Sequence, residues 1–593
     1  MYSTFADLPS YHIFIYNRAK TRAYSGVQRN VLYGTVSTFY LTGSRCSIYS
    51  RGDAFFRPSS QIHQRHIGLF FVQTRSFLPA SEVHTVMAVQ AKKPASLAQA
   101  PAAERHVSFS EPDTSIAIPP RSHPGDNRDR VLCWILFTIS SCVRFYRLGM
   151  PASVVFDEYH FGSFVDNILS GATHFDIHPP LGKLTLAVFG YLVGYRPDPK
   201  FGYDSIGKEF GGVLYYPLRE IAAIFGVVTV PLMYSTARNL DVSWVGSLLV
   251  AGLFCFDNLN IIESRLILMD SQIVFYLVLS LFCALHLWRS PPKTWRRFWW
   301  LTATGLVCGC SISVKWTALA TPGLIAIVSF FGLHFLEDPL TLLECIWAGI
   351  MGLGLYTALF WVHFKTLTHT GPGVGFFPAE FRKTLIGEPD YDPTAVRKPF
   401  FELFVYLNKY MFTANAGITT RHNWESYWYQ WVVNWRGLLY SNTPIGDKWA
   451  SVYLFANPII CWVCAAFVGL FIVIFLFSIR YRDAKWLKAL RKESFLYARR
   501  TSTFLFWGWL INLLPYILVD RSAFVYHYLP GLIYAQLLSG VMVDQLPMKL
   551  RVFSVLVLMS VSIACFVYYA PWIYCTPLTS EEHSARRWLR RWD

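Results

Sequence analysis

Residues 266–288 read LILMDSQIVFYLVLSLFCALHLW, an almost uninterrupted apolar run. A helix needs about 20 apolar residues to cross a hydrocarbon core of about 30 Å, so this run has the length of a membrane span. Comparable runs recur from residue 130 to the C-terminus. The sequence predicts about eleven spanning helices: 131–148, 216–237, 243–260, 266–288, 298–315, 317–335, 341–363, 453–477, 501–519, 524–543 and 550–571.

The composition agrees with a multispanning membrane protein. Hydrophobic residues make up 53% of the 593 residues and aromatic residues 17%, whereas charged residues make up only 15%. That balance excludes an ordinary soluble protein. The net charge of +16 comes from Lys and Arg in short loops and in the N-terminal region, so it indicates topology and no nucleic-acid partner. Most cysteines, including Cys461 and Cys464, lie inside apolar segments and form no disulfide framework.

Two basic loops predict the orientation. Spans four and five are joined by a loop carrying Arg289, Lys293, Arg296 and Arg297, and the loop 478–500 between spans eight and nine is also rich in Lys and Arg. By the positive-inside rule both loops are cytosolic. The N-terminus is then cytosolic, and the segments 149–215 and 364–452 are lumenal.

The N-terminal region differs from the rest of the chain. Its first 86 residues are rich in Ser, Arg, Tyr and Phe, and from Met87 the composition shifts to Ala, Pro, Lys and Ser. We interpret 1–129 as a disordered cytosolic region whose residues 1–86 are an N-terminal extension foreign to the rest, with a transit peptide as the alternative. The other predicted domains are 130–363, a catalytic membrane module; 364–452, a lumenal loop; 453–571, a C-terminal four-helix membrane module; and 572–593, a lumenal tail that is basic despite its side.

The first lumenal segment carries the strongest catalytic candidates. It contains Asp157-Glu158 followed by His160-Phe-Gly, and then His178-Pro-Pro-Leu-Gly-Lys183. Adjacent carboxylates directly after a span can act as a general base and its helper. The apolar stretch 184–195 is too short to span and fits a helix along the lumenal interface, which would hold these acids near the membrane.

Charged residues at span ends predict a polar site at the lumenal face. An ionisable residue in a span is costly and is usually paired or functional, although snorkelling at a helix end is a common alternative. Cations next to carboxylates suit a lipid-phosphate sugar donor, because cations hold the phosphate and a carboxylate deprotonates the acceptor hydroxyl. The predicted substrate-binding residues are His178, Lys183, Arg219, Arg265, Asp270, Lys315, His422, Glu425, Arg521 and His527.

A metal site is the weaker interpretation of the same loop. The potential ligands are Asp157, Glu158, His160, His174, Asp176 and His178, and their spacing matches no ligand motif. We therefore expect no protein-bound metal or other cofactor, and leave divalent-metal dependence open. A transporter is also disfavoured, because its substrate site usually lies near the bilayer midplane whereas these groups collect at one face.

The ordered motifs resemble the eukaryotic protein O-mannosyltransferases, integral glycosyltransferases of the GT-C type that use dolichyl phosphate mannose. The resemblance runs from about residue 130 to the C-terminus. It rests on Val155-Phe-Asp-Glu158, His160-Phe-Gly162, His178 to Lys183, Ser264-Arg265, Met269-Asp270-Ser271, Ser313-Val-Lys-Trp316, Gly371-Pro-Gly373, Arg521 with Tyr526-His-Tyr-Leu-Pro530, and Pro577-Leu-Thr579.

The resemblance implies an all-α GT-C fold with eleven spans, a cytosolic N-terminus and a lumenal C-terminus. It implies that Asp157 is the catalytic base with Glu158 beside it, and that Arg219 belongs to the site. The implied reaction is transfer of mannose, with inversion, to Ser or Thr hydroxyls of proteins in the endoplasmic reticulum lumen. A dimer with another family member is implied as well.

One departure from the family concerns the second lumenal segment. Family members usually carry an inserted β-trefoil, the MIR domain, after the position of Gly373, whereas here Phe376 to Pro399 leads almost directly into Phe400. We predict that this chain lacks the MIR domain. The alternative function is a non-catalytic partner subunit of such a transferase, against which the presence of Asp157, Glu158 and Arg219 weighs.

Overall fold

A computed structural model describes residues 125–333, 335–481 and 493–592. Each of the eleven predicted spans overlaps a helix of this structure, although the ends differ by several residues in some of them. These helices are α1 (Asn127–Phe145), α4 (Tyr216–Asn239), α5 (Trp244–Cys255), α7 (Asp270–Trp288), α8 (Trp295–Val314), α9 (Ala320–Phe331), α10 (Leu342–Thr366), α14 (Pro458–Arg480), α16 (Glu493–Ile511), α17 (Leu529–Asp544) and α18 (Met548–Ile573). The N-terminal region up to residue 124 and residues 482–492 of the second basic loop lie outside the described residues.

Five of the described helices are long and apolar enough to cross a membrane by length and composition: α4, α7, α10, α14 and α18. The third predicted span is wrong as a single helix, since α5 ends at Cys255 and a short helix, α6 (Asn258–Glu263), follows. The break has a local cause in the buried Asp257. Its carboxylate accepts hydrogen bonds from the backbone N–H groups of Asn260 and Asn457, at 3.2 and 2.9 Å, which favours a new helix start over continuation.

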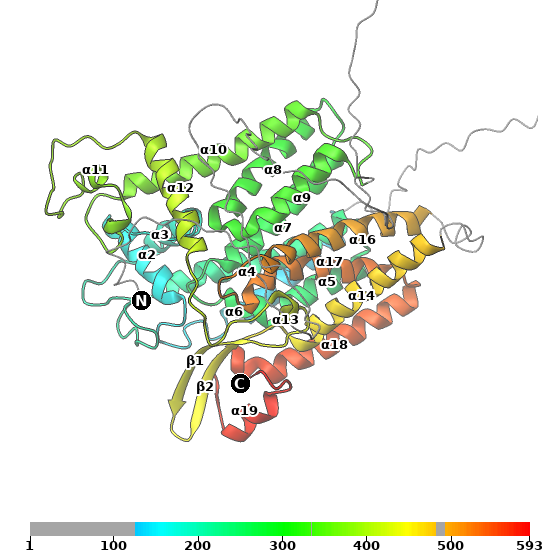
Figure 1. The fold of residues 1–593 in the computed structure, drawn as a ribbon. Coiled ribbons are helices and arrows are strands. Elements are labelled where there is room, and N and C mark those ends of the chain that lie inside the picture. Colours follow the sequence, from blue (N-terminus) through cyan, green and yellow to red (C-terminus); the bar gives the residue numbers. More distant parts are fainter. Residues whose placement is uncertain (1–124, 334, 482–492, 593) are drawn as a thin grey trace, which may run out of the picture. The chain divides into compact units, whose positions relative to one another are not determined.

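The helices pack in two neighbouring groups, coloured mainly cyan to green and mainly yellow to red in Figure 1. In the first group α8 packs between α7 and α10, and α4 packs between α1 and α7. In the second group α17 packs against α5, α14 and α16. Helices α8 and α10 approach closely at Gly309, where an added Cβ would lie 2.6 Å from the carbonyl oxygen of Gly352. Small residues at such a crossing are typical of helices that pack inside a membrane.

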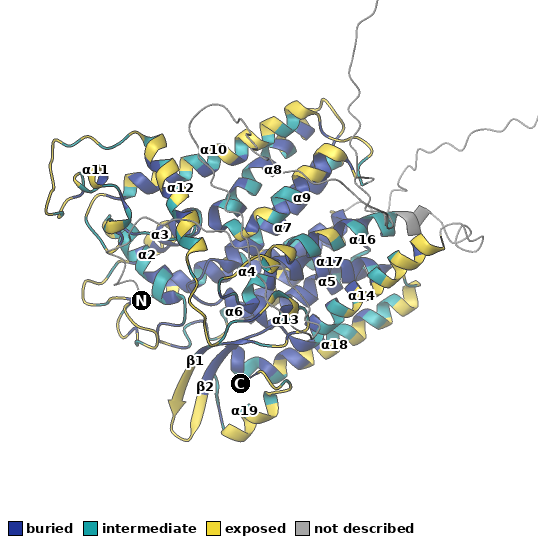
Figure 2. Ribbon diagram, in the orientation of Figure 1, coloured by how far each residue is buried: buried dark blue, intermediate teal, exposed yellow. Residues whose placement is uncertain are grey.

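The outward faces of the bundle are apolar, as the exposed positions on α10, α14 and α18 in Figure 2 illustrate. They include Leu343 and Leu353 on α10, Val473 on α14, and Leu556 on α18. Such large exposed apolar surfaces fit lipid and not water. The protein is therefore a multi-pass membrane protein.

The remaining helices gather at one end of the bundle (Figure 1). They are α2 (Glu158–Ser170), α3 (Leu181–Leu192), α11 (Ala379–Arg382), α12 (Phe400–Ala416), α13 (Trp428–Val432) and α19 (Ser580–Arg586), with the 3₁₀ turns η1 (Trp316–Leu319), η2 (Val374–Phe376), η3 (Leu514–Ile517) and η4 (Val525–Tyr528). Helix α3 exposes Val188, Phe189 and Leu192, as expected for a helix lying along the membrane interface. Between η2 and α12 the chain contains the short helix α11, and the lack of a MIR domain stays a prediction.

A three-stranded antiparallel sheet at this end was not predicted from the sequence. Strand β1 (Leu438–Ile445) pairs with β2 (Lys448–Leu454), and β2 pairs with β3 (Pro577–Leu578) of the C-terminal tail. The turn Gly446-Asp447 is a recognisable two-residue hairpin signal. The register shifts at Tyr440, which lies in a β-bulge between Leu439 and Ser441. A bulge re-aims a side chain, and here it points Tyr440 into the body of the protein.

Candidate active site

Asp157 stands at the start of α2 with its carboxylate free. It occupies the N-cap position, yet its side chain makes no capping hydrogen bond, and no hydrogen bond to this carboxylate is found in the described part of the chain. The preceding residue, Phe156, has φ of +45°, a strained value for a bulky side chain that occurs most often at functional sites. Asp157 is only partly covered by its neighbours. An acceptor group can therefore reach it.

Glu158, by contrast, is fully buried and saturated with partners. Its two carboxylate oxygens accept hydrogen bonds from Arg219 at 2.8 Å each, and from the backbone N–H groups of Val155 and Ile267 at 2.9 Å each. Side-chain exposure of both Glu158 and Arg219 is 0%, so neither group is available to a ligand in this structure. Glu158 therefore ties the loop before α2 to the membrane helices.

Arg219 uses every donor that it has. Besides Glu158, it donates to the carbonyl oxygens of Leu148, Pro151 and Ser153 at 3.3, 2.8 and 3.2 Å. A guanidinium has five N–H donors, and all five are occupied. The sequence-based hypothesis that Arg219 contacts a donor phosphate does not fit these contacts. Arg219 instead holds the loop that presents Asp157.

Arg265 also supports the backbone, at the C-terminal end of α1. Its guanidinium donates to the carbonyl oxygens of Arg144, Tyr146 and Arg147 at 2.6–2.9 Å, and it lies 4.6 Å from the ring centroid of Tyr574. These carbonyls include the end of α1, which the cation satisfies in place of a cap. The guanidinium of Arg265 is thus bonded to the backbone at the end of α1, and it supports the chain there.

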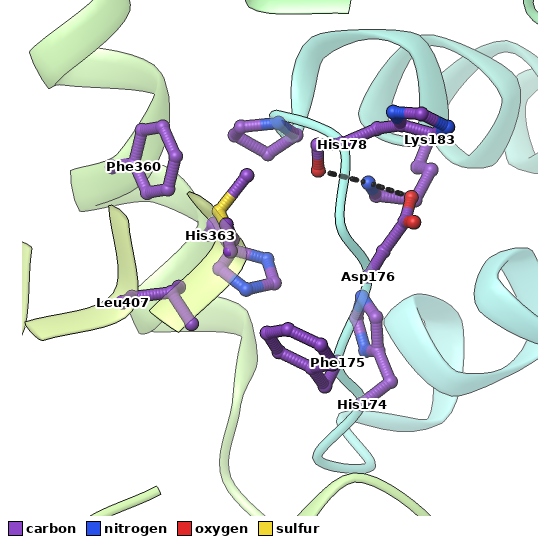
Figure 3. Close-up of a pocket in the computed structure, with 10 residues that line it drawn as sticks. His174, Phe175, Asp176, His178, Lys183, Phe360, His363 and Leu407 are labelled. Carbon is purple, nitrogen blue, oxygen red and sulfur yellow. Dashed lines mark hydrogen bonds and ion pairs between the residues drawn. The ribbon is translucent and has the colours of Figure 1, made fainter. Parts of the chain in front are cut away.

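Lys183 folds back onto the motif from which it comes. Its ammonium donates to Asp176 at 2.5 Å and to the carbonyl oxygens of His178 and Pro179 at 2.8 and 3.1 Å (Figure 3). All three donors are used, and the side chain is 2% exposed. The prolines prevent a helix before Leu181, so the motif forms a tight loop whose conformation Lys183 fixes. Burial lowers the pKa of His178 to about 3, so its imidazole is neutral.

The same loop is held from its other side by the Gly371-Pro-Gly373 motif. Gly373 donates its N–H to the carbonyl oxygen of Thr173 at 3.0 Å, and Thr173 donates to the carbonyl oxygen of His369 at 2.9 Å. A Cβ on Gly373 would lie 2.3 Å from the backbone nitrogen of Phe175. Only glycine allows this approach. Beside it, Nε2 of His174 and Nδ1 of His363 have no hydrogen-bond partner among the described residues, and both rings border a small cavity (Figure 3).

Lys315 and Asp270 bring charge from two spans to the site. They form an ion pair with an N···O distance of 2.7 Å and are nearly buried. Burial raises the pKa of Asp157, while His160 and Lys315 oppose that rise and Asp270 and Asp176 add to it. These five ionisable groups therefore share one electrostatic environment. A carboxylate with a raised pKa is a better proton acceptor than an ordinary aspartate.

Arg521 supplies a second cation, close enough to His178 to help lower its pKa. Its only hydrogen bond in the described part of the chain goes to Asn415, so most of its donors are available. Burial and the neighbouring Arg521 and Lys315 lower the pKa of His527, which is neutral and stacks on Trp431 at 5.9 Å between ring centroids. Two cations thus face a site containing neutral imidazoles.

His422 and Glu425 are bonded to Ser522, in the turn that follows Arg521. Glu425 accepts a hydrogen bond from the Ser522 hydroxyl at 2.7 Å, and the same hydroxyl accepts from the backbone N–H of His422 at 3.0 Å. The ring of His422 meets that of Phe524 at 5.1 Å. Both residues are therefore tied to the turn that follows Arg521.

Sequence reasoning missed two residues that border Asp157. Tyr440, from the β-bulge, stacks on Phe156 with ring centroids 4.5 Å apart, and its hydroxyl donates to buried Glu263 at 2.5 Å. Glu263 ends α6, 177 residues earlier in the chain. No local pattern connects these positions. The only available signals were a carboxylate beside Ser264-Arg265 and the hairpin turn.

A search of the described residues for groups of at least three His, Cys, Asp or Glu side chains that could hold a metal ion found none.

Two family models and several known proteins match the sequence of this chain. The family model "Dolichyl-phosphate-mannose-protein mannosyltransferase" matches residues 134–368, and "C-terminal four TMM region of protein-O-mannosyltransferase" matches residues 400–592. Dolichyl-phosphate-mannose–protein mannosyltransferase 4 of Candida albicans is 36% identical over 261 residues, covering 42% of this chain and 34% of the relative. The Saccharomyces cerevisiae protein of the same name is 33% identical over 271 residues, covering 43% and 35%. The matched segment thus spans about a third of each relative's length.

A solved structure extends the likeness to the fold. A chain of the S. cerevisiae protein O-mannosyltransferase Pmt1-Pmt2 complex bound to the sugar donor superposes with a TM-score of 0.72 at 19% identity, covering 80% of this chain and 93% of that chain. The fold is therefore the GT-C fold of membrane-embedded glycosyltransferases. With both family models matched, the chain belongs to the protein O-mannosyltransferase family.

Proposed function

We propose that this protein transfers mannose from dolichyl phosphate mannose to Ser or Thr hydroxyls of proteins in the endoplasmic reticulum lumen. The single observation that carries the proposal is the free carboxylate of Asp157, with its raised pKa, in the electrostatic reach of Lys315, while Arg521 acts on His178 in the neighbouring loop. A carboxylate that lacks internal partners beside cations that can hold a phosphate is the arrangement that the reaction needs.

The proposed step is one inverting displacement. Asp157 accepts the proton of the acceptor hydroxyl as its oxygen attacks the anomeric carbon of mannose. The bond from that carbon to the phosphate oxygen breaks, and its electron pair leaves with dolichyl phosphate. A β-linked donor then gives an α-linked product, and no covalent sugar–enzyme intermediate forms.

Arg521 and Lys315 would stabilise the leaving phosphate. The guanidinium of Arg521 has donors to spare, and charge-assisted hydrogen bonds to phosphate strengthen as negative charge develops. Lys315 remains paired with Asp270, so that pair orients the ammonium towards the site. Glu158, Arg219, Arg265 and Lys183 would act by positioning, because their donors and acceptors are occupied within the chain.

The proposal also includes a partner chain and a location in the cell. The solved neighbour is a Pmt1-Pmt2 complex, and we infer that this chain likewise pairs with another family member. The donor lipid and the acceptor proteins place the reaction at the lumenal face of the endoplasmic reticulum membrane. We further infer that no cofactor bound by the protein takes part, and transfer measured with and without a chelator tests whether a divalent cation is needed.

The non-catalytic partner subunit is the less favoured alternative. A chain that only supports a catalytic partner has no need for a free, pKa-shifted carboxylate on a strained backbone at Phe156. Two transfer assays separate the alternatives. Membranes containing this chain, with its partner disabled at the position equivalent to Asp157, should still move labelled mannose from the donor to a Thr-containing peptide. Absence of transfer there, with restoration by an intact partner, would favour the alternative.

A further inference from the structure

A second cavity, of about 370 Å³, lies between the hairpin and the C-terminal tail. Here it is named the hairpin–tail cavity. The hairpin side contributes Asn442, Trp449 and Ser451, the tail contributes Ser584 and Arg587, and Trp572 is among the remaining lining residues. Its volume falls in the range of small-molecule sites, about 300–1,000 Å³. None of these residues belongs to the candidate active site.

The walls of this cavity are fixed before any ligand arrives. Strand β3 pairs with β2 through Trp449 and Leu578, and His583 both contacts the carbonyl oxygen of Trp449 at 3.0 Å and accepts from the indole N–H of Trp572 at 2.9 Å. The indole of Trp592 donates to the carbonyl oxygen of Asn434 at 2.9 Å, which pins the end of the tail. A preformed cavity loses little entropy on binding.

The lining points to a sugar. Trp449 is 40% exposed and offers an aromatic face, and the C–H face of a pyranose packs well against the negative face of such a ring. Around it are the Asn442 amide, whose oxygen already accepts from the Ser451 hydroxyl at 2.7 Å, and the Arg587 guanidinium. The amide N–H groups and the guanidinium can donate to sugar hydroxyls. The side chain of Arg587 has no carboxylate partner in the described part of the chain, and none of the described lining residues is acidic. The lining thus suits a hydroxyl-rich ligand that packs on Trp449 and accepts hydrogen bonds from Arg587.

The position of the cavity suggests which sugar it holds. Asn442, on its wall, follows Tyr440 by two residues on β1, and two residues extend a strand by about 7 Å. Tyr440 stacks on Phe156, directly before Asp157. Strand β1 thus links the cavity wall to the residue that packs beside Asp157, so one extended acceptor polypeptide could place a hydroxyl at Asp157 and another of its residues at the cavity.

We propose that the hairpin–tail cavity binds a mannose residue already attached to the acceptor polypeptide, so that the protein prefers to mannosylate next to an existing mannose. The identity of the sugar rests on the proposed function. The cavity would hold the modified residue while a nearby hydroxyl reacts at Asp157. It would thereby favour clusters of mannosylated residues.

Direct binding tests this proposal without any transfer. The full chain in lipid nanodiscs is titrated with a Thr peptide bearing α-mannose, with the same peptide unmodified, and with free mannose. The mannosylated peptide should bind about tenfold more tightly than the unmodified one, and Trp449→Ala should remove that difference, while Trp449→Phe keeps most of it. Trp435→Ala, at an exposed tryptophan outside the cavity, is the matched control and should change nothing.

Transfer to a peptide with two neighbouring Thr residues gives the second readout. Trp449→Ala should leave the first transfer unchanged and lower the ratio of doubly to singly mannosylated product. Equal binding of both peptides, or free mannose binding as tightly as the mannosylated peptide, would overturn the proposal. Selective binding by a chain that transfers nothing would instead contradict the proposed function and leave the cavity's assignment standing.

Discussion

Asp157 is the residue on which the proposed chemistry depends. Asp157→Asn keeps the size of the side chain and removes the proton acceptor. Because general-base catalysis typically contributes about 10²- to 10⁴-fold, the transfer rate should fall at least about a hundredfold. Donor binding and protein level should stay normal, since the carboxylate has no hydrogen bond to lose in the described part of the chain. Near-normal transfer by folded Asp157→Asn at saturating donor would show that the base lies elsewhere.

The pH dependence of transfer should report the same carboxylate. Burial raises the pKa of Asp157, and a base is active only when deprotonated, so activity is lost as the pH falls through that raised value. The acidic limb of kcat/KM should therefore lie above the ordinary aspartate value of about 3.9. The measurement is kcat/KM across pH with thermal stability followed at each point. A profile still flat at about pH 4 with intact protein would contradict the environment described for Asp157.

Arg219 should behave as a support and not as a donor ligand. Arg219→Ala leaves the buried Glu158 carboxylate without its cation, and breaking a buried pair costs about 3–5 kcal/mol. The variant should therefore lose thermal stability markedly. Lys208→Ala, which breaks an exposed pair with Asp204, should lose little and serves as the control.

The double variant Glu158→Gln with Arg219→Met sharpens this test. It removes both buried charges, so it should recover part of the stability that Arg219→Ala loses. Unchanged stability of Arg219→Ala combined with weaker donor binding would support direct contact between Arg219 and the donor phosphate.

Sequence spacing alone cannot predict whether a charged residue of the site contacts a ligand or supports a loop. The acids and cations of the site were found because charge near a span end is costly and therefore conspicuous. Whether a charge faces a ligand or its own loop depends on which backbone carbonyls come within reach, as the five occupied donors of Arg219 show. Asp157 and Glu158 are adjacent in sequence, yet the turn into α2 leaves the carboxylate of Asp157 partly accessible and buries that of Glu158.

At the scale of elements, the hairpin connects the second lumenal segment to the catalytic loop. Tyr440 packs on Phe156 with its ring and holds Glu263 with its hydroxyl. Tyr440→Ala removes both contacts, and a misplacement of about 1 Å can cost about 10²-fold in rate, so kcat should fall by roughly that factor with KM for the donor little changed. Tyr440→Phe keeps the stack and should lose less.

A purely structural role for Tyr440 would give a different pattern. In that case both variants would lower the amount of folded protein in parallel with activity, and the kcat of the surviving fraction would be normal. Tyr429→Ala, at an exposed tyrosine of the same segment, provides the matched control. The pH profile of Tyr440→Ala should keep its acidic limb, because Asp157 still accepts the proton.

The helices were predictable element by element, and the irregular parts were not. Apolar runs of spanning length predicted α4, α7, α10, α14 and α18 to within a few residues, because lipid requires every backbone group to be satisfied within the helix. The break after α5 depends on Asp257 bonding to Asn457, 200 residues away. Likewise β3 pairs with β2 from the far end of the chain, a contact that only tertiary structure creates.

For the whole molecule, the placement of all candidate groups at one end of the bundle fixes a topology that can be tested. The hairpin turn Gly446-Asp447 and the turn Pro291-Pro292 are both exposed, and they lie in segments predicted to be on opposite sides of the membrane. The basic residues Arg289 and Arg296 flank the second turn, so the positive-inside rule keeps it cytosolic. A topology tag could be inserted in either basic loop. Lys488, in the second basic loop, lies outside the described residues, so the exposed turn Pro291-Pro292 in the first basic loop is the better position.

A protease-cleavable tag inserted at each turn should therefore give opposite results in sealed microsomes. The tag after Pro291 should be cleaved by added protease, and the tag after Gly446 should be protected until detergent opens the membrane. Both insertions fall in exposed turns that tolerate added residues, so folding should survive, and retained mannosyl transfer by the Pro291 insertion verifies it. Cleavage of both tags without detergent would put the hairpin, and with it Tyr440 and Asp157, on the cytosolic side. Transfer to lumenal acceptors would then be impossible, because the carboxylate and its acceptor would be separated by the bilayer.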